Sequence, residues 1–391
     1  MDRRLLVLAV DMFAIGTDSF VIAGILPEVT QSLGVSIAVA GQMVTVYALS
    51  FAVLSPVIAA AAAHWPRKRL LLAGLAVFVI GNLVTAIAPT IEWVLASRFV
   101  AGLGAAMFSP TATATAASLV PAEKRARALA IVVAGLSGAT ALGSPLGTFI
   151  GGLGDWRATM WFVTVVGAVA TIGVYVLLPA VPPLPAVSLR ARLGPLKDIR
   201  VALTLLTTLV AYSGFFAVYT YLGVTFDRAT GGRPEVLAAL LLLWGIAATA
   251  GNLAAGYFTD RFGNRMIVNG SLAIAVANFA LMPWSSADLW SSALALVVWG
   301  ICGWGLLVPQ QHRLISLSPA SASLLLGLNS AALYVGVSAA GLIGAAGITV
   351  LERHQLGLIG GLFVGVAFVI AQVANWQIRK GSEIELGLAT P

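Results

Sequence analysis

Residues 11–29 read DMFAIGTDSFVIAGILPEV, and this stretch decides the fold. Apart from Asp11 and Asp18 the run is apolar almost to its end, where Glu28 follows Pro27. About 20 apolar residues are enough for a helix to cross a bilayer, so we predict a membrane-spanning helix over residues 5–27. A carboxylate inside the bilayer costs about 2.5 kcal/mol or more, so two of them in one span indicate a function.

The composition of the whole chain supports this interpretation. Of its 391 residues, 59% are hydrophobic and 9% are charged, whereas soluble domains carry about 25% charged residues. The apolar runs do not show the two-residue alternation of a membrane barrel. We therefore predict an all-α polytopic membrane protein with twelve transmembrane helices, near residues 5–27, 37–62, 70–89, 93–118, 128–151, 158–179, 201–225, 235–258, 266–286, 289–310, 323–349 and 356–377.

The lysines and arginines set the expected orientation, because these residues gather in cytoplasmic loops. With the N-terminus inside, 17 of the 22 basic residues fall on cytoplasmic segments, four fall on the opposite side and Arg98 lies within a span. We expect a multi-pass protein of the cytoplasmic (inner) membrane with both termini in the cytoplasm. The net charge of +7 then reflects topology, so no nucleic-acid partner is needed to explain it.

Residues 180–200 divide the chain into two halves. This stretch, AVPPLPAVSLRARLGPLKDIR, holds four prolines and four basic residues. It predicts a cytoplasmic linker between an N-terminal six-helix bundle (residues 1–179) and a C-terminal six-helix bundle (residues 201–391). The halves also echo one another, since AAAAHWPRKRLLL (60–72) and GYFTDRFGNRMIV (256–268) are basic turns at the same place in each half.

A second feature that repeats in both halves is a row of small residues. Gly135, Ala139, Gly143, Gly147 and Gly151 recur every four residues in the fifth span, and the eleventh span has Gly336, Ala340 and Gly344. Such rows let two helix backbones approach closely. We expect the fifth-span row to pack against the eighth span or another helix of the second half.

Three motifs carry a family resemblance. GYFTDRFGNR (256–265) has the loop pattern G-x-x-x-D-R-x-G-x-R, and SRFVAGLGAA (97–106) has R-x-x-x-G-x-G. The third, GLSGATALGSPLGTFIGG (135–152), is a glycine-rich row around Pro145 in which Ser144 replaces a common glycine. Together they resemble the major facilitator superfamily and its twelve-helix drug:proton antiporters, most closely the chloramphenicol and multidrug efflux branch.

The resemblance implies a fold of two pseudo-symmetric bundles and gives roles to the motif residues. The turn residues would form a cytoplasmic charge latch, although Ala59 and Ala63 replace the usual Gly and Asp in the first half. The alternative is that these charged turn residues serve only solubility and membrane orientation. The residues expected in gating are Arg67, Lys68, Gly143, Pro145, Gly147, Gly256, Asp260, Arg261, Gly263 and Arg265.

The intramembrane charges are the candidates for proton coupling. A helix turns about 100° per residue, so Asp11 and Asp18 share one face, which we expect to line the central path. Arg98 lies at a depth similar to that of Asp18, so the two can pair or share a network through water. We predict that Asp18, Arg98 and Asp11 take part in proton coupling. The alternatives are a static ion pair for Asp18 and Arg98, and simple solvation for Asp11.

Other polar and aromatic side chains are candidates for a substrate pocket at mid-membrane between the halves. Trp244 and Asn252 lie eight residues apart on one helix face, and a buried amide requires a partner. The residues expected to line the pocket are Asp18, Tyr47, Phe108, Tyr219, Trp244, Asn252 and Trp304.

We therefore predict a monomeric proton-coupled antiporter that exports small amphipathic compounds, plausible examples being antibiotics such as chloramphenicol. No Walker loop occurs and the three histidines show no metal-site spacing, so we expect no metal and no cofactor, with the proton gradient as energy source. A sugar or nucleoside exporter is the alternative, although the spans hold few amides and carboxylates. An enzyme is disfavoured because no span pairs His, Ser or carboxylates at catalytic spacing, and a sensor is disfavoured because we find no soluble output domain.

Overall fold

The computed structural model describes residues 2–121, 124–183 and 189–385, and the regular secondary structure of these residues is helical throughout. Within these residues, twelve helical segments are long and apolar enough to cross a membrane, which confirms the predicted all-α class and the number of spans. The first span is longer than predicted, because its helix continues past Glu28 to Leu33.

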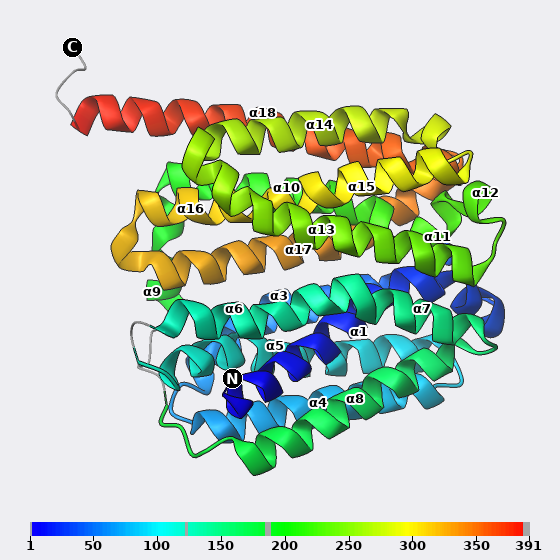
Figure 1. The fold of residues 1–391 in the computed structure, drawn as a ribbon, viewed down its shortest axis with the longest axis horizontal. Coiled ribbons are helices and arrows are strands. Elements are labelled where there is room, and N and C mark those ends of the chain that lie inside the picture. Colours follow the sequence, from blue (N-terminus) through cyan, green and yellow to red (C-terminus); the bar gives the residue numbers. More distant parts are fainter. Residues whose placement is uncertain (1, 122–123, 184–188, 386–391) are drawn as a thin grey trace.

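The first half of the chain forms one bundle, which we call the N-terminal bundle (Figure 1). Its helices are α1 (Arg3–Leu33), α2 (Ile37–Ala40), α3 (Gln42–Ala61), α4 (Arg67–Ile87), α5 (Ile91–Ser118), α6 (Arg125–Gly138), the π-helical turn η2 (Ala139–Gly143), α7 (Ser144–Gly152) and α8 (Trp156–Leu177). The predicted linker, 180–200, includes residues 184–188, which lie outside the described part. Its other residues contain α9 (Leu189–Leu193) and η3 (Gly194–Lys197).

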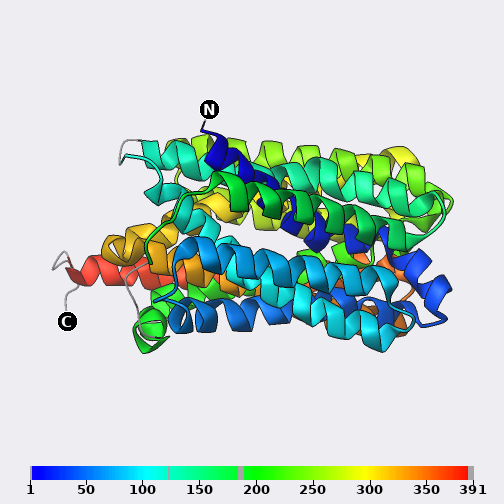
Figure 2. The ribbon, with the colours of Figure 1, turned by 90° about the horizontal axis from the view of Figure 1, so that it is seen from below.

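The second half forms the C-terminal bundle. Its helices are α10 (Ile199–Thr220), α11 (Leu222–Thr225), α12 (Asp227–Thr230), α13 (Pro234–Phe262), α14 (Asn264–Ser285), α15 (Leu289–Gly305), α16 (Leu307–Leu317), η4 (Pro319–Ser321), α17 (Ala322–Val350), η5 (Arg353–Gln355) and α18 (Leu356–Glu385). Seen from below in Figure 2, the long helices of both bundles run along a common axis.

Gly34 and Gly263 are two of the glycines that end helices in a backbone conformation that other residues rarely adopt. Gly34 caps α1 with φ of 64°, and Gly263 separates α13 from α14 with φ of 81°. A glycine takes a positive φ without the steric cost of a Cβ atom. The glycine of the loop motif therefore makes the tight turn that joins the eighth and ninth spans.

The two rows of small residues pack inside their own bundles. Gly143 lies against Thr17 of α1, and a Cβ atom on Gly147 would lie 3.0 Å from Thr159 of α8 and also meet Val21 of α1. The close approach is as expected, but the expectation of a second-half partner is wrong. The reason is that α1 also presents small side chains along this face, so the two backbones can meet. In the C-terminal bundle, the Gly336 row packs on α10 in the same way.

The bundles meet along two equivalent seams, as expected for repeats related by pseudo-symmetry. In one seam α3 packs on α17, and in the other η2 and α7 pack on α13. In the second seam, a Cβ atom on Gly245 would lie only 2.6 Å from the Cα atom of Ala141. The seams therefore place backbone against backbone at the junction of the halves.

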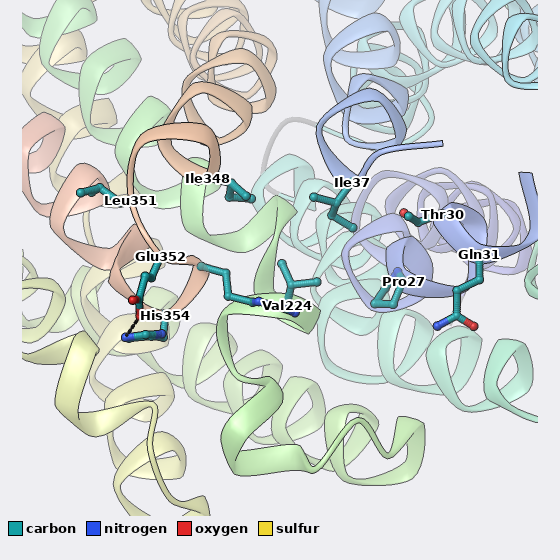
Figure 3. A pocket seen from close by; sticks show the side chains of 10 residues that line it. Pro27, Thr30, Gln31, Ile37, Val224, Ile348, Leu351, Glu352 and His354 are labelled. Atoms are coloured by element: carbon teal, nitrogen blue, oxygen red, sulfur yellow. Dashed lines mark ion pairs between the residues drawn. The ribbon is translucent and has the colours of Figure 1, made fainter. Parts of the chain in front are cut away.

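We call the end that carries α9 the linker end, and the end that carries the α1–α2 turn the far end. Contacts between the bundles extend to the far end, where Gly223 meets Pro27 and Gly152 meets Pro234. Outside this closure a hollow of about 760 Å³ opens at the surface between the bundles (Figure 3). Its walls include Pro27 and Ile37 from the first half and Val224, Ile348 and His354 from the second.

Candidate functional site

A buried ion pair lies inside the N-terminal bundle. Arg98 of α5 donates from Nη1 to the Oδ1 atom of Asp18 at 2.6 Å, and both side chains are essentially inaccessible. The predicted similarity in depth is thus confirmed as direct pairing. Removing one partner of a buried pair leaves an uncompensated charge, so the two residues depend on one another.

Two neutral side chains complete this site. Asn82 of α4 donates to Asp18 Oδ2 at 3.4 Å and accepts from Arg98 at 3.3 Å, so it bridges the pair. The Arg98 guanidinium lies 4.5 Å from the ring centroid of Tyr47, within the range of a cation–π interaction. In this conformation the Asp18 carboxylate is enclosed, and its partners come from α4 and α5 of the same bundle, so its place on the central path stays a prediction.

Asp11 lies two turns away on the same helix. It is fully buried, and neither of its carboxylate oxygens has a hydrogen-bond partner in the described part of the chain. The alternative of simple solvation for Asp11 does not hold in this conformation, because the side chain is buried. A buried carboxylate without partners is costly when ionised, so the site favours the neutral acid.

Aromatic rings form a box at the centre of the molecule. Three predicted residues, Tyr219, Trp244 and Trp304, come together there, with Tyr219 and Trp244 at a centroid separation of 4.6 Å. The box is completed by Tyr212, Phe215, Phe216, Trp299 and Gly303. Its cavity of about 10 Å³ leaves room for about one water molecule, so the box is closed in this conformation.

The N-terminal bundle contributes Phe20 to the box. Its ring centroid lies 5.8 Å from that of Trp304 and 6.1 Å from that of Tyr219. The Tyr219 hydroxyl donates to the carbonyl oxygen of Phe20 at 3.1 Å and lies 3.3 Å from the Ser144 hydroxyl. The box is therefore shared between the halves. The Trp244 indole N–H is buried without a partner among the described residues, so it is a free donor for a ligand.

The remaining predicted pocket residues lie elsewhere. Asp18 and Tyr47 belong to the buried ion pair, and Phe108 packs in the apolar core of the N-terminal bundle. Asn252 lies two turns from Trp244 on α13, and its buried Oδ1 atom has no partner in the described part. The structure thus separates one predicted pocket into a charged site and an aromatic site.

Hydrogen bonds fix the basic turn of the first half to neighbouring helices. Arg67 donates to the Ser118 hydroxyl at 2.7 Å and to the Ala114 carbonyl oxygen at 3.1 Å, which joins the start of α4 to the end of α5. Lys68 donates to the Tyr175 carbonyl oxygen at 2.8 Å. These contacts stay within the N-terminal bundle.

The basic turn of the second half has few partners. Arg261 donates to the Tyr257 hydroxyl at 3.0 Å, while Asp260 and Arg265 are exposed. Among the described residues Asp260 forms neither an ion pair nor a hydrogen bond, so the expected latch is not engaged in this conformation. A Cβ atom on Gly256 would meet no neighbouring atom of the described residues, and Pro145 is the second residue of α7, which follows the π-helical turn.

Sequence reasoning missed several residues of these sites. Asn82 is the one amide of the third span, and this was a readable signal for a partner of a buried charge. Phe20 and Trp299 gave no such signal, because aromatic side chains are common on every face of a membrane helix. Their roles follow only from how α1 and α15 are placed.

Twelve spans in two bundles, with a charged site in one and an aromatic site shared between them, define a membrane transport protein. The sequence profile of the Major Facilitator Superfamily matches residues 8–341, and the chain belongs to this superfamily. The expectation of a transporter, not an enzyme, is confirmed by this membership.

Relatives are similar over nearly their whole length. The uncharacterized MFS-type transporter YbcL of Bacillus subtilis (strain 168) is 27% identical over 366 residues, which are 94% of each chain. A chloramphenicol resistance protein of Streptomyces lividans is 32% identical over 386 residues, covering 95% of this chain and 96% of that protein. Among solved structures, a bacterial homolog of the human lysosomal transporter Spinster, in an inward-facing and occupied conformation, has a TM-score of 0.77 at 16% identity. It covers 96% of this chain and 97% of that chain.

Proposed function

We propose that the protein is a proton-coupled exporter of small amphipathic compounds that carry aromatic rings. The observation that supports this most is the double role of α1. The helix holds Asp18 in the buried pair on one face, and it places Phe20 in the aromatic box on another. One helix therefore carries a titratable group and also contributes a ring to the aromatic box.

The mechanism follows from the charge of the pair. A proton on Asp18 removes the partner of Arg98, and breaking a buried pair in this way costs about 3–5 kcal/mol. The two conformations of a carrier differ by only a few kcal/mol. Protonation is therefore large enough to change which conformation is favoured, and movement of α1 carries Phe20 with it.

The chemistry of the box supports the substrate class. Ring faces and edges line it, and aromatic pairs contribute about 0.5–1.5 kcal/mol beyond apolar burial. Polar groups are few, and the unpartnered indole N–H of Trp244 is a donor for one acceptor on the ligand. Chloramphenicol fits this description, and similarity to a resistance protein against it makes it the first compound to test.

The proposed direction is export from the cytoplasm across the inner membrane, in exchange for protons that enter the cell. The linker end is proposed as the cytoplasmic side, because most of the basic residues lie on its loops. The far end is then the outer side, and its closure is the outward gate. A monomer in the bilayer is sufficient, because the two bundles of one chain supply both sites.

The test is transport in lipid vesicles with an imposed pH gradient. We expect uphill movement of chloramphenicol or of aromatic amphiphiles in wild type and its loss in Asp18→Asn, with normal folding of the variant. Glu92→Gln is the matched control, since this carboxylate is exposed at the start of α5. Movement of sugars or nucleosides alone would support the alternative substrate class, and uphill transport by Asp18→Asn at the wild-type rate would exclude Asp18 as the coupling site.

A further inference from the structure

A cluster of hydroxyls and rings lies between the buried ion pair and the C-terminal bundle. It comprises Ser19 of α1, Tyr47 and Phe51 of α3, and Tyr334 of α17, and we call it the tyrosine bridge. The Tyr334 ring stacks on Phe51 with centroids 3.9 Å apart. The Ser19 hydroxyl donates to the Tyr47 hydroxyl at 3.2 Å, and the Tyr334 side chain is a second polar neighbour of Ser19.

The bridge is continuous with the ion pair. The ring of Tyr47 lies against the Arg98 guanidinium at 4.5 Å, and Arg98 binds Asp18. A chain of contacts thus runs from Asp18 through Arg98, Tyr47 and Ser19 to Tyr334. Its last member belongs to the other bundle, in the seam where α3 packs on α17.

Few charged or titratable groups face Asp18, so few side chains can respond directly when its charge changes. Arg98 on α5 is the charged neighbour, Tyr47 on α3 is the titratable one, and α4 supplies the neutral Asn82. The other acids of α1 are Asp11, two turns away on one side, and Glu28, ten residues away on the other. Loss of the Asp18 charge therefore acts first on Arg98, which then keeps Asn82, the main-chain carbonyl oxygen of Asp18 at 3.5 Å and the ring of Tyr47 as partners.

We propose that Tyr334 is a positioning residue that transmits the protonation of Asp18 to the seam between α3 and α17. This inference rests on the proposed proton coupling. When Asp18 is charged, Arg98 is fixed, Tyr47 is held under it, and the hydroxyls of the bridge are aligned across the seam. When Asp18 is neutral, Arg98 and Tyr47 shift, the bridge loses its alignment, and the seam is free to open.

The experiment uses Tyr334→Phe, which keeps the ring on Phe51 and removes only the hydroxyl. Tyr221→Phe is the matched control. It removes another hydroxyl of the C-terminal bundle near the same seam, one that donates to the Gly341 carbonyl oxygen at 2.8 Å and is remote from the ion pair. Spin labels at the exposed positions Val39 and Leu342, in a Cys302→Ala background, report the separation across the seam as the pH is changed.

We expect the separation in wild type and in Tyr221→Phe to change with pH, and the change to be lost in Tyr334→Phe and in Asp18→Asn. In vesicles, Tyr334→Phe should lower uphill efflux about tenfold, within the range of known couplings, and leave substrate affinity within about twofold.

Two results would overturn the inference. They are a wild-type separation that does not respond to pH, and a full pH response in Tyr334→Phe. Failure of the proposed function looks different, because the seam would still respond to pH in wild type while no tested compound moved against its gradient.

Discussion

The seam between η2 and α13 gives the sharpest test of how the halves move. Gly245 lies on α13, where it packs against the backbone of the π-helical turn η2. A Cβ atom there would lie 2.6 Å from the Cα atom of Ala141 and 2.7 Å from the carbonyl carbon of Thr140. Both are backbone atoms, which cannot rotate away as a side chain does. Gly245→Ala therefore forces the two halves apart at this point or strains them.

The size of the effect follows from packing. Overpacking costs about 1–3 kcal/mol, and here the cost falls only on the conformation in which the seam is closed. Since about 1.4 kcal/mol is a tenfold change, the equilibrium should shift roughly 5- to 150-fold toward the conformation that is open at the far end. The gain from replacing a mid-helix glycine, about 0.5–1 kcal/mol, applies to both conformations and cancels.

The assay is the distance between spin labels at Gln31 and Leu351, which lie on opposite sides of the far-end hollow (Figure 3). We expect a longer distance in Gly245→Ala than in wild type, in a Cys302→Ala background. Gly147→Ala is the matched control, because that glycine contacts α1 and α8 of its own bundle. An unchanged distance in Gly245→Ala would show that the halves do not separate along this seam.

Three further predictions concern the N-terminal bundle. Arg98→Ala should reduce vesicle transport more than Arg98→Lys, since Lys keeps the charge without the planar fork; equal activity of all three proteins would contradict this. Asp11→Asn should fold normally and lower proton-driven efflux, because the buried acid has no other partner; unchanged efflux across pH would remove Asp11 from the coupling mechanism. Gly147→Leu should lower the thermal stability of the protein without changing the far-end distance, because its side chain would collide with Val21 and Thr159 of its own bundle; a changed distance at normal stability would contradict the observed packing.

The fold was predictable because its signals are local. Apolar runs long enough to span a bilayer mark each helix, and the basic turns repeat at matching positions in the two halves. The depths of Asp18 and Arg98 followed from counting residues, and their pairing agrees with that count. Gly263 also behaves as its place in the loop motif indicates, since its positive φ makes the turn.

The arrangement of the candidate sites was not predictable in the same way. Helical spacing shows that Asp11 and Asp18 share a face, but it does not tell whether that face meets its own bundle or the opposite half. The glycine row around Gly143 has the same ambiguity, because close packing looks identical whichever helix is the partner. Phe108 and Tyr219 are both aromatic residues within spans, and only the assembled bundles put one in a core and the other in the box.

The separation of the two sites has a consequence for the substrates. Asp18 and Phe20 are two residues apart on α1 and point about 200° apart around the helix, so they contact different layers of the molecule. A compound in the aromatic box therefore does not touch the Asp18 carboxylate in this conformation. A positive charge on the compound would not form an ion pair with that carboxylate. Coupling must pass through the movement of α1 and of the seam between the bundles. Neutral and cationic aromatic compounds should then depend equally on Asp18, whereas a direct ion pair between substrate and carboxylate would make the dependence follow the charge of the compound.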